Sequence, residues 1–257
     1  MFCKVDEINF YYEEYGEGTP ILFLSGFATD ITTMRESFEP ILKNYRLKRI
    51  YLDHPGVGKT VFANDLTITN LLSSIENFVN KVFSEKEFLV VGASFGGYLS
   101  RSLLNTFKER MKGLFLLYPL VTHKINGANI EEDVILKKNL VNSSDENVKE
   151  RIQNEVMSSM GNTNFLFLNN LVTQAQELNF DIKSTYYNEP VCILTGRQDA
   201  EVGYKDAFAL INNFPKATFC VLDNASHNLQ IEQKDIFTVF VEDWLNRIKE
   251  SSGIVLK

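Results

Sequence analysis

The sequence predicts an α/β fold in which a mostly parallel central sheet is covered by helices on both faces. Three observations support this class. Short apolar runs recur along the chain, as expected of strands that are buried on both faces. Amphipathic segments with helical spacing separate most of these runs, which is typical of strand–helix–strand units. Between residues 121 and 187 this alternation stops, and only helical patterns are found.

The first part of the chain begins with an expected hairpin. Residues 3–15 alternate between apolar and polar side chains and end in a turn of glycine and proline, a pattern that predicts paired strands. Apolar runs and helical spacing then predict, in order, a strand at 21–24, a helix around 38–45, a strand at 49–52 and a helix over 66–83.

The second part continues the alternation around the interruption. The expected elements are strands at 88–91, 114–117, 191–194 and 218–222, with helices over 98–107 and about 231–248. In the closing helix, the spacing favours four side chains as the face against the sheet: Ile236, Val239, Phe240 and Trp244.

Residues 121–187 are interpreted as a helical cap inserted into a core formed by residues 1–120 and 188–257. Helical patterns cover 134–141, 148–160 and 165–175, and the second follows an N-terminal signal at Ser143-Ser144-Asp145-Glu146. The cap is rich in closely spaced apolar residues, which we expect to form a substrate pocket: Met157, Met160, Phe165, Phe167, Leu168, Leu171 and Val172.

The stretch from Phe88 to Gly97 predicts a sharp turn that presents a nucleophile. An apolar run leads into Gly92-Ala93-Ser94-Phe95-Gly96, and helical spacing follows it. A strand, a tight turn and a helix are the context in which a G-x-S-x-G pattern forms a nucleophile elbow. Ser94 is therefore the candidate nucleophile, and a chance match of the pattern in an ordinary turn is the alternative.

A serine nucleophile needs a general base, and the base needs a carboxylate that orients it. His227 follows the last predicted strand, and Asp199 follows the strand at 191–194. Both therefore lie at the carboxyl ends of strands, where the active sites of such sheets gather. The order Ser94, Asp199, His227 fits a serine–acid–histidine triad.

Other histidines and carboxylates were weighed for these roles. His54 lies in a Pro-Gly turn and is interpreted as a turn residue that borders the site, whereas His123 begins the insertion and is a pocket candidate. Asp206 and Asp223 are rival acids. Asp223 stands only four residues before His227, which is more typical of a surface turn.

The oxyanion formed in acyl transfer needs backbone N–H donors. One candidate is the N–H of Phe95, the residue after the nucleophile, because the positive end of the helix dipole favours negative charge there. The second is the N–H of Phe27, in the glycine-bent loop that follows the strand at 21–24.

Composition limits the partners. The 257 residues carry a formal net charge of −7 and no long basic run, which argues against nucleic acid. Neither a membrane span nor a signal peptide is expected. The three cysteines, Cys3, Cys192 and Cys220, lack metal-ligand spacing and are typical of free thiols in a reducing compartment. The expected location is the cytoplasm, with no cofactor or metal implied, and the oligomeric state stays open.

From end to end the chain resembles the α/β-hydrolases, in particular the capped branch that holds esterases, thioesterases and carbon–carbon bond hydrolases. Five segments carry the resemblance: Ser25-Gly26-Phe27, Asp53-His54-Pro55-Gly56-Val57-Gly58, Gly92-Ala93-Ser94-Phe95-Gly96-Gly97, Gly196-Arg197-Gln198-Asp199 and Ser226-His227. It implies the α/β-hydrolase fold, with the cap inserted after the strand that follows the elbow. It also implies a carboxylesterase-like serine hydrolase that cleaves an ester-type bond of a small acyl substrate. Thioester or carbon–carbon bond hydrolysis is the alternative within the fold.

Two positions depart from the family's usual pattern. Ser25-Gly26 stands where the family usually has His-Gly, so the histidine that often braces the oxyanion loop is missing. Ser226-His227 stands where Gly-His is common. Neither change removes a catalytic atom, and a serine at position 94 excludes the hydrolases of this fold that use an aspartate nucleophile.

Two rival interpretations were considered. Gly56-Val57-Gly58-Lys59-Thr60 resembles a phosphate-binding loop, but that motif needs a glycine where Asp53 stands, and no helical spacing begins at Lys59. A non-catalytic protein of the same fold that only binds a ligand is the second rival, because a fold does not by itself imply a function.

Overall fold

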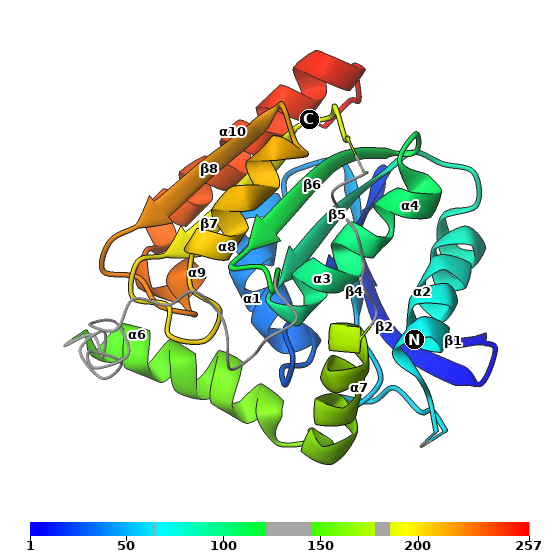
Figure 1. Ribbon diagram of the computed structural model, residues 1–257. Helices are drawn as coiled ribbons and strands as arrows, with labels where there is room; N and C mark the ends of the chain where they lie inside the picture. Colours follow the sequence, from blue (N-terminus) through cyan, green and yellow to red (C-terminus); the bar gives the residue numbers. More distant parts are fainter. Residues whose placement is uncertain (64, 122–144, 178–185, 257) are drawn as a thin grey trace.

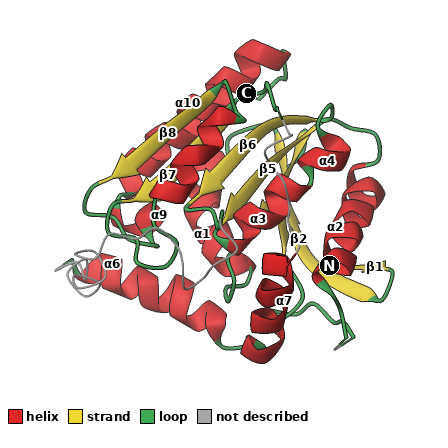
Figure 2. Ribbon diagram, in the orientation of Figure 1, coloured by secondary structure: helices red, strands yellow, loops and turns green. Residues whose placement is uncertain are grey.

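The structure is a computed structural model that describes residues 1–63, 65–121, 145–177 and 186–256. In this part of the chain, one eight-stranded sheet has the order β1-β2-β4-β3-β5-β6-β7-β8, and helices cover both of its faces (Figures 1 and 2). The predicted fold class is confirmed. The strands are β1 (Phe2–Val5), β2 (Ile8–Tyr15), β3 (Thr19–Leu24), β4 (Leu47–Leu52), β5 (Phe88–Ala93), β6 (Met111–Leu117), β7 (Val191–Gly196) and β8 (Ala217–Leu222).

The sheet is antiparallel only at one edge. β1 and β2 form the predicted hairpin, and β2 pairs antiparallel with β4. The pairs from β4 through β3, β5, β6 and β7 to β8 are all parallel. The loops that follow β3, β5, β7 and β8 therefore leave the same edge of the sheet, which is where ligand sites form in open parallel sheets.

Two groups of helices cover the sheet. Side chains of α2 (Ile68–Phe83), α3 (Phe95–Ser102) and α4 (Leu104–Phe107) share one core cluster, while those of α1 (Ile31–Leu42) and α10 (Lys234–Ser252) share the other. Helix α2 begins two residues later than predicted, because Thr67 caps it by accepting from the N–H of Asn70. Each large apolar side chain buried in this way stabilises the fold by roughly 1.5–3 kcal/mol.

The closing helix differs from its prediction. A short helix α9 (Leu229–Glu232) precedes α10, and Gln233 separates them with ψ at 47°. Ile236 and Val239, predicted to face the sheet, are 43% and 63% exposed. Apolar residues at 236–237 and 239–241 form two overlapping stripes that are one residue apart, and the stripe that packs against the sheet is Phe237, Val241, Trp244, Leu245 and Ile248. Trp244 is thus correct and the prediction for Ile236 and Val239 is wrong.

The described part of the insertion is mainly helical. It contains α6 (Glu146–Arg151), a π-helical turn η1 (Ile152–Met157), a 3₁₀ turn η2 (Ser158–Met160) and α7 (Phe165–Glu177). Asp145 caps α6 by accepting from the N–H of Asn147, as the N-terminal signal predicted. The helix predicted at 134–141 and the residue His123 lie outside the described residues. The division into core and cap remains a prediction.

Several hydrogen bonds tie the insertion to the sheet domain. Four of them run from Thr33 Oγ1 to Glu155 O (2.8 Å), from Thr163 Oγ1 to Ala28 O (2.8 Å), from Asn164 N to Gly56 O (2.8 Å) and from Ile68 N to Gln174 Oε1 (2.9 Å). Among the described helices, none combines the length and the apolar character needed to cross a membrane.

Candidate active site

Ser94 lies at the turn between β5 and α3, as predicted. Its φ of 52° lies in the left-handed region, which strains a residue other than glycine. Gly96 permits this turn, because a Cβ at that position would collide with the backbone carbonyl of Leu24. The turn is held by a bond from Ser94 N to Leu117 O (3.0 Å) and by bonds to Ser94 O from Gly97 N and Leu120 N (both 2.9 Å).

His227 and Asp199 are brought together by the loops after β8 and β7. His227 Nδ1 lies 2.9 Å from Asp199 Oδ2. The other Asp199 oxygen accepts from the N–H groups of Glu201 (2.8 Å) and Val202 (3.1 Å). The Asp199 side chain is fully buried, and the bonds to its two oxygens fix the carboxyl group in position toward the ring.

The charges of the pair shift both pKa values. Burial alone would lower the pKa of His227, but the Asp199 carboxylate, with Glu201 and Glu232 farther away, outweighs burial and raises it. Burial alone would raise the pKa of Asp199, but the His227 ring and the two N–H donors outweigh it and lower it. The site therefore favours a charged aspartate beside a histidine with increased proton affinity.

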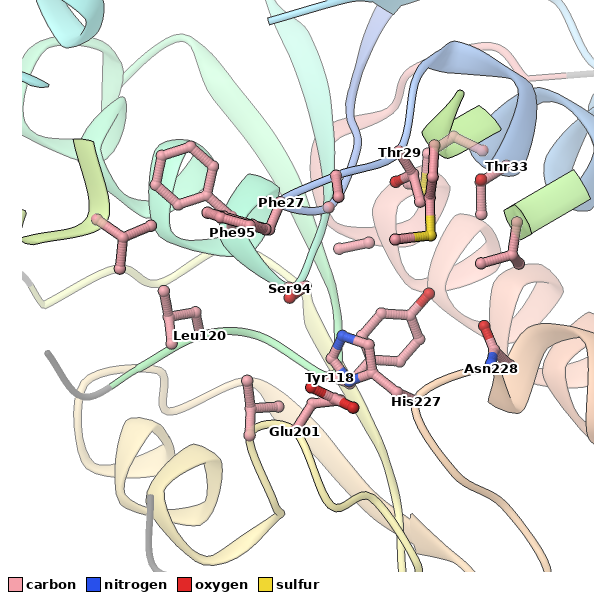
Figure 3. Close-up of a pocket in the computed structure, with 18 of the residues that line it drawn as sticks. Phe27, Thr29, Thr33, Ser94, Phe95, Tyr118, Leu120, Glu201, His227 and Asn228 are labelled. Atoms are coloured by element: carbon pink, nitrogen blue, oxygen red, sulfur yellow. The ribbon is translucent and has the colours of Figure 1, made fainter. Parts of the chain in front are cut away.

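Ser94 and His227 face one another across a cavity (Figure 3). Within the described residues, no hydrogen bond joins Ser94 Oγ to the ring, although Nδ1 is engaged by Asp199 and Nε2 is the nitrogen left for the serine. Such nucleophile–base bonds often tighten only when substrate is bound.

Two neighbours of His227 were missed in the sequence. Glu232 accepts from both the N–H and the hydroxyl of Ser226 (2.6 Å each), which fixes the backbone just before His227. This bond pair accounts for a serine where Gly-His is common. The Tyr118 ring lies against the imidazole, with centroids 4.3 Å apart and planes tilted by 44°. No spacing rule joins Tyr118 to His227, because that contact links separate loops, whereas the Glu232–Ser226 bonds span only six residues.

The rival acids are positioned differently. Asp223 lies at the surface, accepts from Gln198 Nε2 at 2.8 Å, and is fully exposed. Asp206 lies in α8 (Lys205–Phe208), outside the lining of the cavity. Asp199 is the carboxylate that contacts His227.

The loop after β3 lies beside the nucleophile. A Cβ built on Gly26 would be 3.4 Å from Ser94 Cβ. Within the described residues, the N–H groups of Phe27 and Phe95 donate to no protein acceptor. The loop is held at its far end, where Ile31 N donates to the buried Asp53 carboxylate (2.9 Å). Burial raises the pKa of Asp53 to about 6, against the opposing effect of its N–H donors.

The turn Gly56-Val57-Gly58-Lys59 is held by the same Asp53 carboxylate. Asp53 also accepts from the N–H of Lys59 (2.8 Å). Gly56 has a φ of 95°, and a Cβ there would lie 2.6 Å from Leu168 Cδ2 of α7. The turn therefore packs against the insertion, and the next described helix after it begins at Ile68, as expected of a hydrolase turn rather than a phosphate-binding loop.

The cavity has a volume of about 400 Å³ and is lined mainly by apolar side chains. The insertion contributes four residues to it: Val156, Met160, Asn169 and Val172. Met157 and Phe165, which were expected in the pocket, are 53% and 46% exposed and do not line it. Phe167 is buried elsewhere, against Phe62 at a centroid distance of 4.3 Å. In the described part of the chain, no cluster of histidine, cysteine and carboxylate side chains is arranged to hold a metal ion.

Comparison with known proteins defines the family. The sequence profile of the α/β hydrolase fold family matches residues 19–167, which is more than half of the chain. The chain therefore belongs to the α/β hydrolase fold family.

Solved structures of other proteins have a similar fold. An α/β superfamily hydrolase from Oenococcus oeni PSU-1 superposes with a TM-score of 0.81 at 24% identity, over 97% of this chain and 99% of that one. A thermophilic esterase from Thermogutta terrifontis gives 0.74 at 17% identity, over 96% and 99%. These likenesses show the fold.

A match in sequence is found with the proline iminopeptidase of Neisseria gonorrhoeae. It is 33% identical over 140 residues, which are 49% of this chain and 44% of that protein. The match thus spans less than half the length of this curated relative.

Proposed function

We propose that this hydrolase-family chain is a serine hydrolase that cleaves an ester-type bond of a small molecule through an acyl-enzyme on Ser94. The observation that carries this proposal is the 2.9 Å contact between His227 Nδ1 and Asp199 Oδ2, on the wall of the cavity that also contains Ser94. An oriented imidazole facing a serine at an elbow is the arrangement that activates a hydroxyl nucleophile.

In the proposed reaction, Ser94 Oγ attacks the acyl carbon while His227 Nε2 takes its proton. His227 then gives that proton to the leaving alkoxide, and the same two steps with water release the acid. Asp199 orients the ring and stabilises the imidazolium. A raised pKa of His227 favours the proton transfer from Ser94.

The N–H groups of Phe27 and Phe95 are proposed to hold the oxyanion. Both residues line the cavity beside Ser94, and neither N–H has a competing protein acceptor in the described residues. Phe95 is also the first residue of α3, so the helix dipole adds to its hydrogen bond.

An apolar cavity of about 400 Å³ suits a small acyl substrate. The likeness to an esterase supports an ester bond, and the match to a proline iminopeptidase makes an amide bond the second candidate. Thioester and carbon–carbon bond hydrolysis, and ligand binding without catalysis, complete the alternatives. We place the activity in the cytoplasm, because Cys3, Cys192 and Cys220 are all free thiols.

A serine-directed phosphonate tests the nucleophile. We expect labelling of Ser94 in the wild type, none in Ser94→Ala, and a loss in kcat of roughly 10³-fold or more in that variant. Ester hydrolysis near the wild-type rate by purified, folded Ser94→Ala would refute the proposal. Labelling without turnover of any substrate would favour a binding protein.

The type of bond that the protein cleaves is tested with a matched panel of substrates. Esters of graded acyl length, the thioester of the best acyl group, a vinylogous diketone and prolyl anilide should be compared by kcat/KM. We expect an ester to give the highest value, and a higher value for the prolyl anilide would assign a peptidase instead.

A further inference from the structure

His54 lies in the turn after β4 and is completely buried. Its Nε2 is 2.9 Å from the carbonyl oxygen of Gly26, and its Nδ1 is 3.0 Å from that of Pro55. Its ring also meets the Phe95 ring edge-on, with centroids 5.5 Å apart. The side chain therefore contacts both segments that carry the candidate oxyanion donors.

The Gly26 carbonyl and the Phe27 N–H belong to one peptide group. A peptide group is planar and trans, so its C=O and N–H point in opposite directions. A hydrogen bond that fixes the carbonyl on one side thereby fixes the direction of the N–H on the other. It also polarises the amide, which strengthens the N–H as a donor.

The other bonds that hold this loop lie at different peptide groups. Ser25 Oγ donates to Thr29 O (2.7 Å), and Thr163 Oγ1 donates to Ala28 O (2.8 Å). Among the described residues, only His54 hydrogen-bonds to the Gly26–Phe27 peptide group.

We propose that His54 is a positioning residue, whose Nε2–H holds the Gly26 carbonyl and so directs the Phe27 N–H toward the oxyanion on Ser94. This role rests on the proposed function of Ser94. A neutral imidazole carries one N–H and can donate to only one of the two facing carbonyls. Burial lowers the pKa of His54, against the opposing effect of both carbonyls, which keeps the ring neutral.

The position of His54 also accounts for a departure in the sequence. Ser25 stands where the family usually has the histidine that braces this loop. Here a histidine reaches the same loop from the end of the neighbouring strand β4, which pairs with β3 in parallel.

Three variants separate donation by Nε2 from mere filling of space. His54→Leu removes both ring nitrogens, the amide nitrogen of His54→Gln replaces Nε2, and that of the shorter His54→Asn replaces Nδ1. Turnover of an ester should be measured per active site, counted by phosphonate titration, so that unfolded protein does not contribute.

We expect His54→Leu to lower kcat about 10- to 100-fold with little change in KM, because a misdirected oxyanion donor acts on the transition state. The rate of phosphonylation should fall with kcat. His54→Gln should recover most of the loss and His54→Asn should not. Nitrogen chemical shifts of His54 in the wild type should report the Nε2–H tautomer.

Equal activity of the Gln and Asn variants, kcat per site near wild type in His54→Leu, or an Nδ1–H tautomer would each overturn this role. If His54→Leu fails to fold, the comparison of Gln with Asn decides. Failure of the phosphonate to label Ser94 in the wild type overturns the proposed function, and this role with it.

Discussion

At the scale of single residues, two of the five described non-glycine residues with positive φ lie at the candidate site. Ser94 and Tyr118 adopt φ values of 52° and 36°, and such conformations cost about 1–3 kcal/mol each. Hydrogen bonds to neighbouring strands oppose this cost, among them Tyr118 N to Leu194 O at 2.7 Å. These two residues are the candidate nucleophile and the tyrosine whose ring lies against the candidate base, so hydrogen bonds to the sheet help to maintain the shape of the site.

The pH dependence of the reaction follows from the pKa of His227. As a base, His227 must be neutral, so kcat/KM should rise with pH through that pKa. Because Asp199, Glu201 and Glu232 together raise the pKa, we expect the acid limb above the ordinary histidine value of about 6.5.

A pH profile of kcat/KM, measured with a substrate whose chemical step is rate-limiting, tests the pH at which the acid limb lies. Glu201→Gln removes one of the negative charges and should move the limb to lower pH. A limb at or below the ordinary value in the wild type, or no movement in Glu201→Gln, would contradict the assignment.

Substitution of the two aspartates near His227 should affect kcat/KM very differently. Asp199→Asn should lower kcat/KM by roughly 10⁴-fold, because it disturbs the tautomer and the stabilisation of the imidazolium. Asp223→Asn should have little effect, since Asp223 is exposed and contacts Gln198 instead. Steady-state kinetics of both variants check the ranking, and the reverse ranking would exclude Asp199 as the orienting acid.

At the scale of elements, the insertion shapes the cavity through few side chains. Val156 lines it, whereas the adjacent Met157 is 53% exposed. The irregular turns η1 and η2 place Val156 and Met160 on the cavity side. Met157 was expected in the pocket because it lies close in sequence to other apolar residues, and closeness in sequence does not tell which side of a helical turn lines the cavity.

This pair of neighbours offers a matched test of the acyl pocket. Val156→Ala and Met160→Ala should shift the preferred acyl chain toward greater length, since each methylene is worth about 1–3 kcal/mol of discrimination. Met157→Ala should leave the preference unchanged. Relative kcat/KM values over a series of acyl esters check this, and an equal shift in Met157→Ala would show that the lining does not set the preference.

Sequence reasoning succeeded for the elements with strong local patterns and failed for contacts between distant loops. The strands and the elbow were predicted because apolar runs and glycines are local signals. The buried face of α10 was not, because its sequence carries two overlapping apolar stripes and spacing alone does not choose between them. The contact of His54 with Gly26 and that of Tyr118 with His227 depend on which strands become neighbours, and a single sequence carries no pattern for that. The Glu232–Ser226 bonds span only six residues, but they depend on the short helix α9, which apolar spacing did not separate from α10.

At the scale of the whole molecule, the sheet separates two cores, and each supplies side chains to the cavity, such as Phe95 from one and Met34 from the other. One cluster contains Phe95 and residues of the insertion, next to the cavity. The other packs α1 and α10 against the opposite face. Phe38 lies at the centre of this second core, with ring centroids 5.1 Å from Phe23 and 5.0 Å from Phe237.

Truncation in the second core should affect stability without affecting chemistry. Phe38→Ala should lower the free energy of unfolding by about 3–5 kcal/mol, while the exposed Val239→Ala should change it by less than about 0.5 kcal/mol. Denaturant unfolding measures both. The kcat of Phe38→Ala, measured well below its melting temperature, should remain near wild type. A large loss of kcat there would show that the two faces are coupled.

The hydrogen bonds between the insertion and the sheet domain bear on engineering this protein. Thr163 and Glu155 bond to Ala28 and Thr33, and these two partners flank the loop beside Ser94. A foreign insertion grafted from another hydrolase would import its own side chains for the cavity but would lose these anchors. Such a chimera would change substrate selectivity and turnover together. To recover turnover, the grafted helices would also have to provide the hydrogen bonds that Thr163 and the Glu155 carbonyl make to Ala28 and Thr33.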